Sequence, residues 1–217
     1  MLTFAEEILL LLLDDETEDL IPLQGGVLNV TLSGAVLMDL AIRMRIDTDL
    51  ETLTVVDPTP VGEELLDFVL EEIVAADAGH STDYWVERVS QFGEAIKEKA
   101  FARLVERGIL KIIDDKILWV LEIRRYPVID DKEEREVKRR ILDVILSDDI
   151  PDPRDIVLIC LADACSIFDE ILTARELERA SDRIVQVRKL DLIGQAMARA
   201  IEQFRTNLTK ALSSMHV

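Results

Sequence analysis

Residues 32–46 have the sequence LSGAVLMDLAIRMRI, in which apolar side chains recur at steps of three and four residues. An α-helix turns once in about 3.6 residues, so this spacing gathers the apolar side chains on one face. That face consists of Leu32, Val36, Leu37, Leu40, Ala41 and Met44. We therefore predict a helix that buries one broad face and ends near Arg45.

Local signals predict further helices on both sides of this stretch. Thr3 and Glu6 have the spacing of a capping box, in which each side chain satisfies a free backbone N–H at the start of a helix. The apolar run of residues 8–13 follows directly. Ser81 and Asp152, the latter before a proline, have the chemistry of helix N-caps.

Two short stretches predict β-structure. Residues 53–56 are β-branched and apolar, and an Asp-Pro-Thr-Pro turn follows them. After Gly108, a predicted left-handed helix stop, residues 109–120 form two apolar runs around residues 114–116. This composition predicts a hairpin with a polar tip at Asp-Asp-Lys. Its outgoing strand, residues 117–121, is apolar on both faces and is expected to be buried, paired with another subunit or pressed against lipid.

These elements predict a mostly α fold. We expect a single globular helical domain over residues 1–217, with a small central β element that includes a protruding apolar hairpin. The chain is 49% hydrophobic and 32% charged, with eight glycines and six prolines, so long disordered segments are not expected. Beyond Pro127 the pattern is helical to the end, and Leu190-Asp-Leu marks the junction of the last two helices.

Acidic residues are concentrated in the first half of the chain. The whole chain has 25 Lys and Arg against 44 Asp and Glu, a net charge of −19. Residues 1–96 account for −18 of this, and residues 97–217 are nearly neutral at −1. A uniformly acidic surface repels nucleic acid and anionic lipid. Any anion-binding face is therefore predicted in the second half.

The residues that serve catalysis and metal binding are scarce. Two histidines, His80 and His216, are too few for the usual zinc sites, and no glycine-rich phosphate loop follows a strand. Cys160 and Cys165 are expected to be free thiols in reducing cytosol. We expect no catalytic residue, no metal and no cofactor, and hence a protein that is not an enzyme. The sequence indicates neither a signal peptide nor a transmembrane helix.

Basic residues and the apolar hairpin lie close together in the sequence. Binding to an anionic membrane needs cations for the headgroups, at about 1 kcal/mol each, and an apolar element at the boundary. The candidate lipid or anion ligands are Lys97, Arg103, Arg124 and Arg125. The candidate membrane-contact or oligomer residues are Ile117, Leu118, Trp119 and Val120.

Two other interpretations remain open at this point. The hairpin fits a soluble oligomeric interaction protein that does not bind lipid. The order helix, glycine stop and hairpin from residue 101 onward also fits a winged-helix DNA binder, but acidic residues interleave with the basic ones on that helix. We therefore expect no nucleic-acid partner.

Six motifs, in order, resemble the Golgi phosphoprotein 3 family over essentially the whole chain. They lie at residues 2–15, 32–46, 57–67 (DPTPVGEELLD), 104–110 (LVERGIL), 125–127 (RYP), and 152–154 with 158–164 (DPR and LICLADA). The sequence looks most like a compact, prokaryotic-type member. The resemblance implies a mostly α-helical adaptor, cytoplasmic and peripheral at a membrane surface. Eukaryotic members of the family bind phosphatidylinositol 4-phosphate and the cytosolic tails of glycosyltransferases.

The lipid ligands of that family carry over only in part. By alignment, its tryptophan, arginine and two basic helix residues correspond to Gln24, Ser33, Glu94 and Lys97. Of these, Lys97 alone keeps the charge type. A phosphomonoester needs about three charge-assisted donors, so the resemblance implies weak or altered binding of a phosphoinositide-like anionic lipid. Cytosolic tails of membrane proteins and a second copy of the chain, joined through the hairpin, are the other expected partners.

Overall fold

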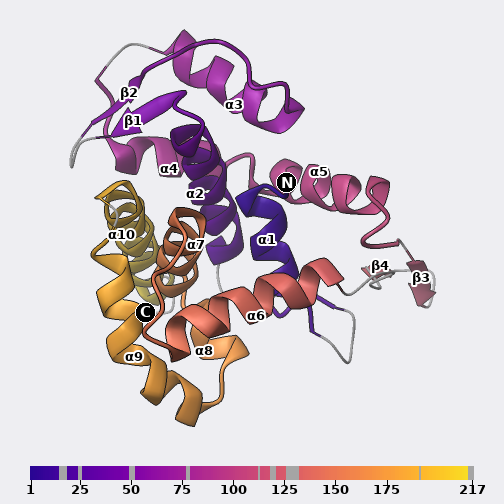
Figure 1. The fold of residues 1–217 in the computed structure, drawn as a ribbon. Helices are drawn as coiled ribbons and strands as arrows, with labels where there is room; N and C mark the ends of the chain where they lie inside the picture. The colour runs from indigo at the N-terminus through magenta and orange to yellow at the C-terminus, as the bar shows by residue number, and fades with distance from the viewer. Residues whose placement is uncertain are drawn as a thin grey trace.

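Helix α2 (Val27–Ile42) lies in the middle of the helical body, and six other helices pack against it. The computed structural model describes residues 1–14, 19–23, 26–48, 52–76, 79–111, 113–117, 121–125, 132–190 and 192–214. The other helices are α1 (Phe4–Leu11), α3 (Glu64–Ala75), α4 (Thr82–Ser90), α5 (Gly93–Glu106), α6 (Lys132–Leu146), α7 (Pro153–Ala164), α8 (Ile167–Ile171), α9 (Ala174–Arg188) and α10 (Leu192–Ser214). The predicted mostly α class is confirmed (Figure 1).

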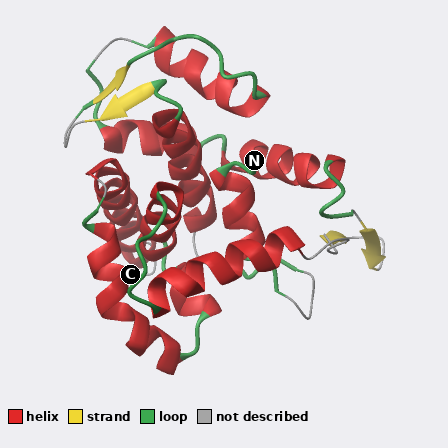
Figure 2. Ribbon diagram, viewed as in Figure 1, coloured by secondary structure: helices red, strands yellow, loops and turns green. Residues whose placement is uncertain are grey.

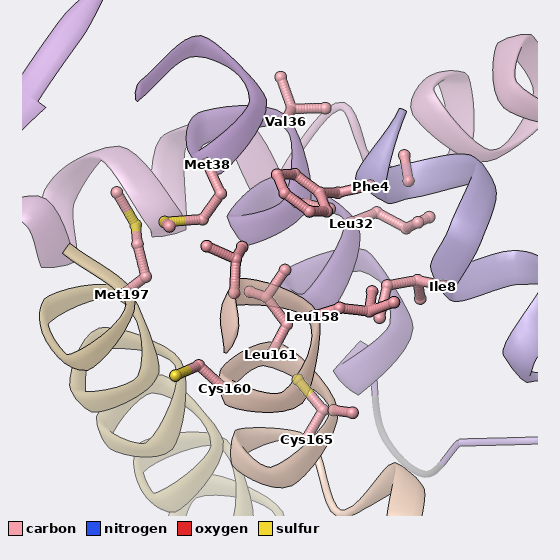
Figure 3. Packing of buried hydrophobic residues seen from close by; sticks show 14 of the residues in the cluster. Phe4, Ile8, Leu32, Val36, Met38, Leu158, Cys160, Leu161, Cys165 and Met197 are labelled. Atoms are coloured by element: carbon pink, nitrogen blue, oxygen red, sulfur yellow. The ribbon is translucent and has the colours of Figure 1, made fainter. Parts of the chain in front are cut away.

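The core forms where α1, α2, α7 and α10 meet. Figure 3 shows Phe4 of α1, Leu32 of α2, Leu161 of α7 and Met197 of α10 directed toward a common interior, and all four are buried. A glycine permits the close approach of these helices. A Cβ atom on Gly34 would lie 2.8 Å from Ile201 Cδ1 and 2.9 Å from Leu161 Cδ2. The helix predicted from residues 32–46 therefore buries nearly its whole circumference and not one face alone.

The predicted caps are present. Thr3 and Glu6 form the capping box of α1, with both reciprocal hydrogen bonds. Ser81 accepts from the backbone of Tyr84 at the start of α4, and Asp152 accepts from the backbone of Arg154 at the start of α7. Gly108 is left-handed, with φ of 72°, as expected for the stop after α5. These contacts are local, which explains why sequence spacing predicted them.

Two small antiparallel sheets lie at opposite ends of the helical body (Figure 2). Strands β1 (Ile46–Thr48) and β2 (Leu53–Val55) pair with Ile46 opposite Val55, which confirms the strand predicted at residues 53–56. Strands β3 (Ile113–Ile117) and β4 (Leu121–Arg125) form the second hairpin, beside the ends of α5 and α6 (Figure 1).

The register of the second hairpin corrects the predicted tip. The sequence indicated a turn at residues 114–116, but these residues lie within β3, where Asp114 pairs with Arg124 and Lys116 with Glu122. Residues 118–120 join the two strands. The sequence interpretation did not consider pairing with residues beyond 121.

The second half of the chain is helical as predicted, with breaks that periodicity did not reveal. The predicted free thiols are present: Cys160 and Cys165 are buried and form no disulfide (Figure 3). Burial raises the pKa of the Cys165 thiol to about 12, so that it stays protonated at neutral pH. The helical path is interrupted after Cys165, because Ser166 takes a left-handed conformation with φ of 58° before α8 begins.

Candidate functional site

Lys97, on α5, is bound to a carboxylate of its own helix. Its Nζ lies 2.5 Å from Glu94 Oε2, one turn earlier. Adjacent charges three residues apart face each other on a helix. The positive charge predicted to bind lipid is therefore shared with an acidic neighbour.

Arg103, six residues further along α5, is held by two carboxylates. Its Nε lies 3.2 Å from Glu6 Oε1, and its guanidinium also donates two hydrogen bonds to Glu63. Glu6 is fully buried and accepts a hydrogen bond of 2.6 Å from the backbone N–H of Thr3. Arg103 therefore joins α5 to the starts of α1 and α3, and its charge is compensated.

The structure does not bring Lys97 and Arg103 together. Six residues on a helix separate two side chains by about 9 Å along the axis and about 120° around it. Arg124 and Arg125 lie on β4, opposite Asp114 and Ile113 of β3. The side chains of Arg124 and Arg125 lie outside the described part of the structure, so their role as anion ligands remains a prediction.

The hairpin candidates lie only partly within the described residues. Ile117 is the last residue of β3 and pairs with Leu121. Leu118, Trp119 and Val120 lie outside the described residues, so the predicted membrane contact or oligomer contact remains a prediction.

Two of the residues aligned with the family's lipid ligands make contacts within the protein itself. Ser33 is fully buried in α2, and its Oγ donates to the carbonyl of Val30 at 2.7 Å. Glu94 pairs with Lys97. Gln24 lies outside the described residues.

A cavity that sequence reasoning missed is lined by residues of α6 and of the end of α5, the two helices that flank the β3–β4 hairpin in the sequence. It has a volume of about 470 Å³ and lies between the N-terminal segment, the end of α5, α6 and the start of α7. We call it the hairpin-base cavity. Its charged lining residues are Glu7, Arg107, Glu133, Glu136, Arg140, Asp152, Arg154 and Asp155.

Glu7 connects two arginines of the hairpin-base cavity. Its Oε1 accepts from Arg140 Nη2 at 2.7 Å and its Oε2 accepts from Arg154 Nη2 at 2.6 Å. Arg140 also pairs with Asp155, and Arg154 donates to the carbonyl of Leu2 at 2.9 Å. Since Glu7 is more than 130 residues from both arginines along the chain, no local pattern could indicate this network.

Asp39 lies behind the network, 1% exposed on α2. Its Oδ2 accepts from the backbone N–H of Phe4 at 2.7 Å, and its Oδ1 lies 3.9 Å from Arg154 Nη1. Burial raises the pKa of Asp39 to about 7, against the lowering effects of the Phe4 hydrogen bond and of Arg154. The carboxyl group therefore changes its charge close to neutral pH, where α1 meets α2.

The lining of the hairpin-base cavity carries no net positive charge. Three arginines line it against five carboxylates, and two of those arginines already bind Glu7. Among the described residues, no group of three or more His, Cys, Asp or Glu side chains is arranged to hold a metal ion. The network can hold the N-terminal segment against α6 and α7, which is a structural task.

The described helices include none with the length and apolar character needed to cross a bilayer.

Comparison with known proteins supplies the remaining finding. The model of the family "Golgi phosphoprotein 3 (GPP34)" matches residues 4–204. Vacuolar protein sorting-associated protein 74 of Eremothecium gossypii is 26% identical in an alignment of 215 positions that covers 82% of this chain. The match spans 63% of the length of that relative.

Proposed function

The chain belongs to the Golgi phosphoprotein 3 family, and from this membership we propose that it is a non-enzymatic adaptor, cytoplasmic and peripheral at a membrane surface, that has largely lost the phosphoinositide ligands of the family. It binds anionic lipid weakly, or with altered preference, and binds cytosolic tails of membrane proteins. The match to a protein named for vacuolar protein sorting supports a role at membranes.

One observation supports the proposed loss of phosphoinositide recognition. At the aligned ligand positions, Ser33 is buried and Glu94 binds Lys97 at 2.5 Å. A phosphate must then compete with a carboxylate for the one cation that remains. About three charge-assisted donors hold a phosphomonoester tightly, so a single shared donor supports weak binding only.

Flotation with vesicles tests the proposal. Vesicles of phosphatidylcholine containing phosphatidylinositol 4-phosphate, phosphatidylserine or cardiolipin are compared at matched negative charge and low salt. We expect recovery with all three and little preference for the phosphoinositide. A strong preference for phosphatidylinositol 4-phosphate would contradict the loss of its ligands, and no recovery with any of the three would remove lipid binding.

A separate substitution tests whether Lys97 contributes to lipid binding. Glu94→Gln frees Lys97 and should raise vesicle affinity about fivefold, since one basic residue at a membrane surface contributes about 1 kcal/mol. Glu98→Gln changes the same charge on the exposed side of the same helix and is the matched control. Equal effects of the two variants would show that net charge acts and that Lys97 does not.

The apolar hairpin supports a second function, an oligomeric interaction protein without lipid binding. β3 and β4 extend from the helical body between α5 and α6, and the connecting residues 118–120 are apolar (Figure 1). Replacing Leu118 and Trp119 with serine should then lower the mass measured by size exclusion with light scattering. An unchanged mass together with lost vesicle recovery would assign the hairpin to membrane contact.

A further inference from the structure

The junction of α9 and α10 forms a small surface cavity with an unusual charge. It has a volume of about 210 Å³ and is lined by Val185, Arg188, Lys189, Gln195 and Arg199. Three of these residues are basic and none is acidic. Figure 1 shows α9 and α10 on the side of the molecule opposite β3 and β4. We call this feature, together with the adjacent Leu190, the α9–α10 elbow.

Two cations of the elbow, Lys189 and Arg199, have exposed side chains. Within the described part of the chain, neither Lys189 nor Arg199 forms a salt bridge with a carboxylate. The Nε of Arg199 donates to the carbonyl of Gln195 at 3.3 Å, which leaves its charge without a carboxylate among the described residues. The chain has a net charge of −19, and Lys97 and Arg103 each pair with a carboxylate. Lys189 and Arg199 differ from them, because no carboxylate among the described residues pairs with either.

Arg188 gives the elbow a fixed wall. Its Nη1 pairs with Asp163 of α7 and its Nη2 lies 2.7 Å from Glu202 of α10, so the guanidinium is held between two helices. Its own charge is neutralised by these carboxylates. The attraction for an anion therefore comes from Lys189 and Arg199, and the Gln195 amide can add a neutral donor.

Exposed apolar side chains flank these cations. Val185 is 50% exposed on the cavity wall, and Leu190, which follows Lys189 directly, is 59% exposed. Free phosphate in solution would gain nothing from contact with these apolar side chains. Cations beside exposed apolar side chains are the combination that a membrane interface favours, because headgroups bind the charges and the acyl boundary accepts the apolar groups.

We propose that the α9–α10 elbow is a contact site for anionic phospholipid membranes, in which Lys189 and Arg199 bind headgroup phosphates and Leu190 enters the interface. The inference rests on the proposed peripheral role but names a surface separate from α5 and the β3–β4 hairpin. It also accounts for lipid binding in a chain whose family ligand positions are occupied by a buried serine and an ion pair.

Vesicle flotation with charge-reversal variants tests the elbow. The double variant Lys189→Glu with Arg199→Glu is compared with Arg175→Glu with Arg179→Glu, which makes the same charge change at exposed residues near the start of α9. With phosphatidylserine vesicles at low salt, neutralisation alone predicts about a fivefold loss of affinity for each cation, or about 30-fold for the elbow pair. The control pair should lose several-fold less. Circular dichroism and thermal unfolding confirm that both variants fold.

A second arm separates a membrane from free phosphate. Leu190→Ser keeps every charge and should lower vesicle affinity about threefold or more at any salt concentration, since it removes a buried apolar side chain. If Leu190→Ser has no effect and inorganic phosphate displaces the vesicles, the elbow is a phosphate site and the membrane assignment is overturned.

The remaining outcomes separate this inference from the proposed function. Wild-type recovery that is unaffected by the elbow pair, or equally affected by the control pair, overturns the elbow and leaves the adaptor role intact. Absence of wild-type recovery with every anionic vesicle overturns lipid binding altogether. Loss of recovery in the elbow pair, with Lys97→Glu unchanged, supports the elbow over α5.

Discussion

The hairpin-base cavity and the α9–α10 elbow both contain three basic side chains, yet they are opposite in electrostatic character. At the first, Glu7 binds two of the arginines and further carboxylates line the walls. At the second, Arg188 is paired, while Lys189 and Arg199 keep their charges exposed. The number of cations at a place thus says little about anion binding. Their compensation by neighbouring carboxylates decides it.

The two regions also differ in what their charges do for the fold. Glu7 is 3% exposed, and its ion pairs join α1 to α6 and to the start of α7. Removing one partner of a buried pair leaves the other charge without compensation, which costs several kcal/mol. Exposed charges such as Lys189 contribute little to stability and can be changed without unfolding the protein. The first region is therefore structural, and the second is available for binding.

The largest expected effect comes from breaking the first region. Glu7→Gln leaves Arg140 and Arg154 without their shared carboxylate and should lower the free energy of unfolding by about 3–5 kcal/mol. Urea unfolding followed by circular dichroism measures this change. Adding Arg140→Gln should not restore the loss, because Arg140 also pairs with the buried carboxylate of Asp155. A loss below about 1 kcal/mol would show that the network is not structural.

Asp39 provides a test by pH. Its pKa is raised from 3.8 to about 7 in the folded protein, so the folded state binds this proton more tightly than the unfolded chain. The contribution of Asp39 to the free energy of unfolding must therefore fall as pH rises through this range. The free energy of unfolding of Asp39→Asn, relative to wild type, should rise by about 2–4 kcal/mol between pH of about 5 and about 8. Parallel pH profiles of the two proteins would contradict this.

A smaller change in vesicle affinity is expected at the α9–α10 elbow, where it tests the part played by Arg188. Glu202→Gln removes one of the two carboxylates that neutralise Arg188, and it should raise affinity for phosphatidylserine vesicles about fivefold at low salt. The gain should disappear as salt screens the charges. Gln203→Glu, on the exposed side of the same helix, makes the opposite charge change and should act weakly. No change in Glu202→Gln would argue that Arg188 does not face bound lipid.

The smallest expected effect concerns the exposed pair of Lys99 with Glu64. The side chain of Glu64 is 84% exposed, so the ion pair is solvated and contributes about 0–1 kcal/mol. Glu64→Gln should leave the urea midpoint nearly unchanged. A cost similar to that of Glu7→Gln would mean that burial does not distinguish the two classes of ion pair.

Sequence reasoning reached most of the helices and their caps, because these depend on residues three or four apart. Thr3 with Glu6 and Asp152 with the backbone of Arg154 are examples. It misplaced the tip of the second hairpin, since the pairing of Asp114 with Arg124 depends on a partner ten residues away. It also treated Lys97 and Arg103 as available cations, although Glu6, 97 residues from Arg103, compensates one of them.

The sequence alone determined the mostly helical fold, the family and the confinement of acidity to the first half, because periodicity, motifs and charge counts are properties of the chain itself. The tertiary structure decided which charges are compensated. Arg140 binds Glu7, which is 133 residues away along the chain. Lys189 and Arg199 line the same cavity and have no acidic partner among the described residues. Coulomb interactions depend on distance in space and on burial, and neither follows from separation along the chain.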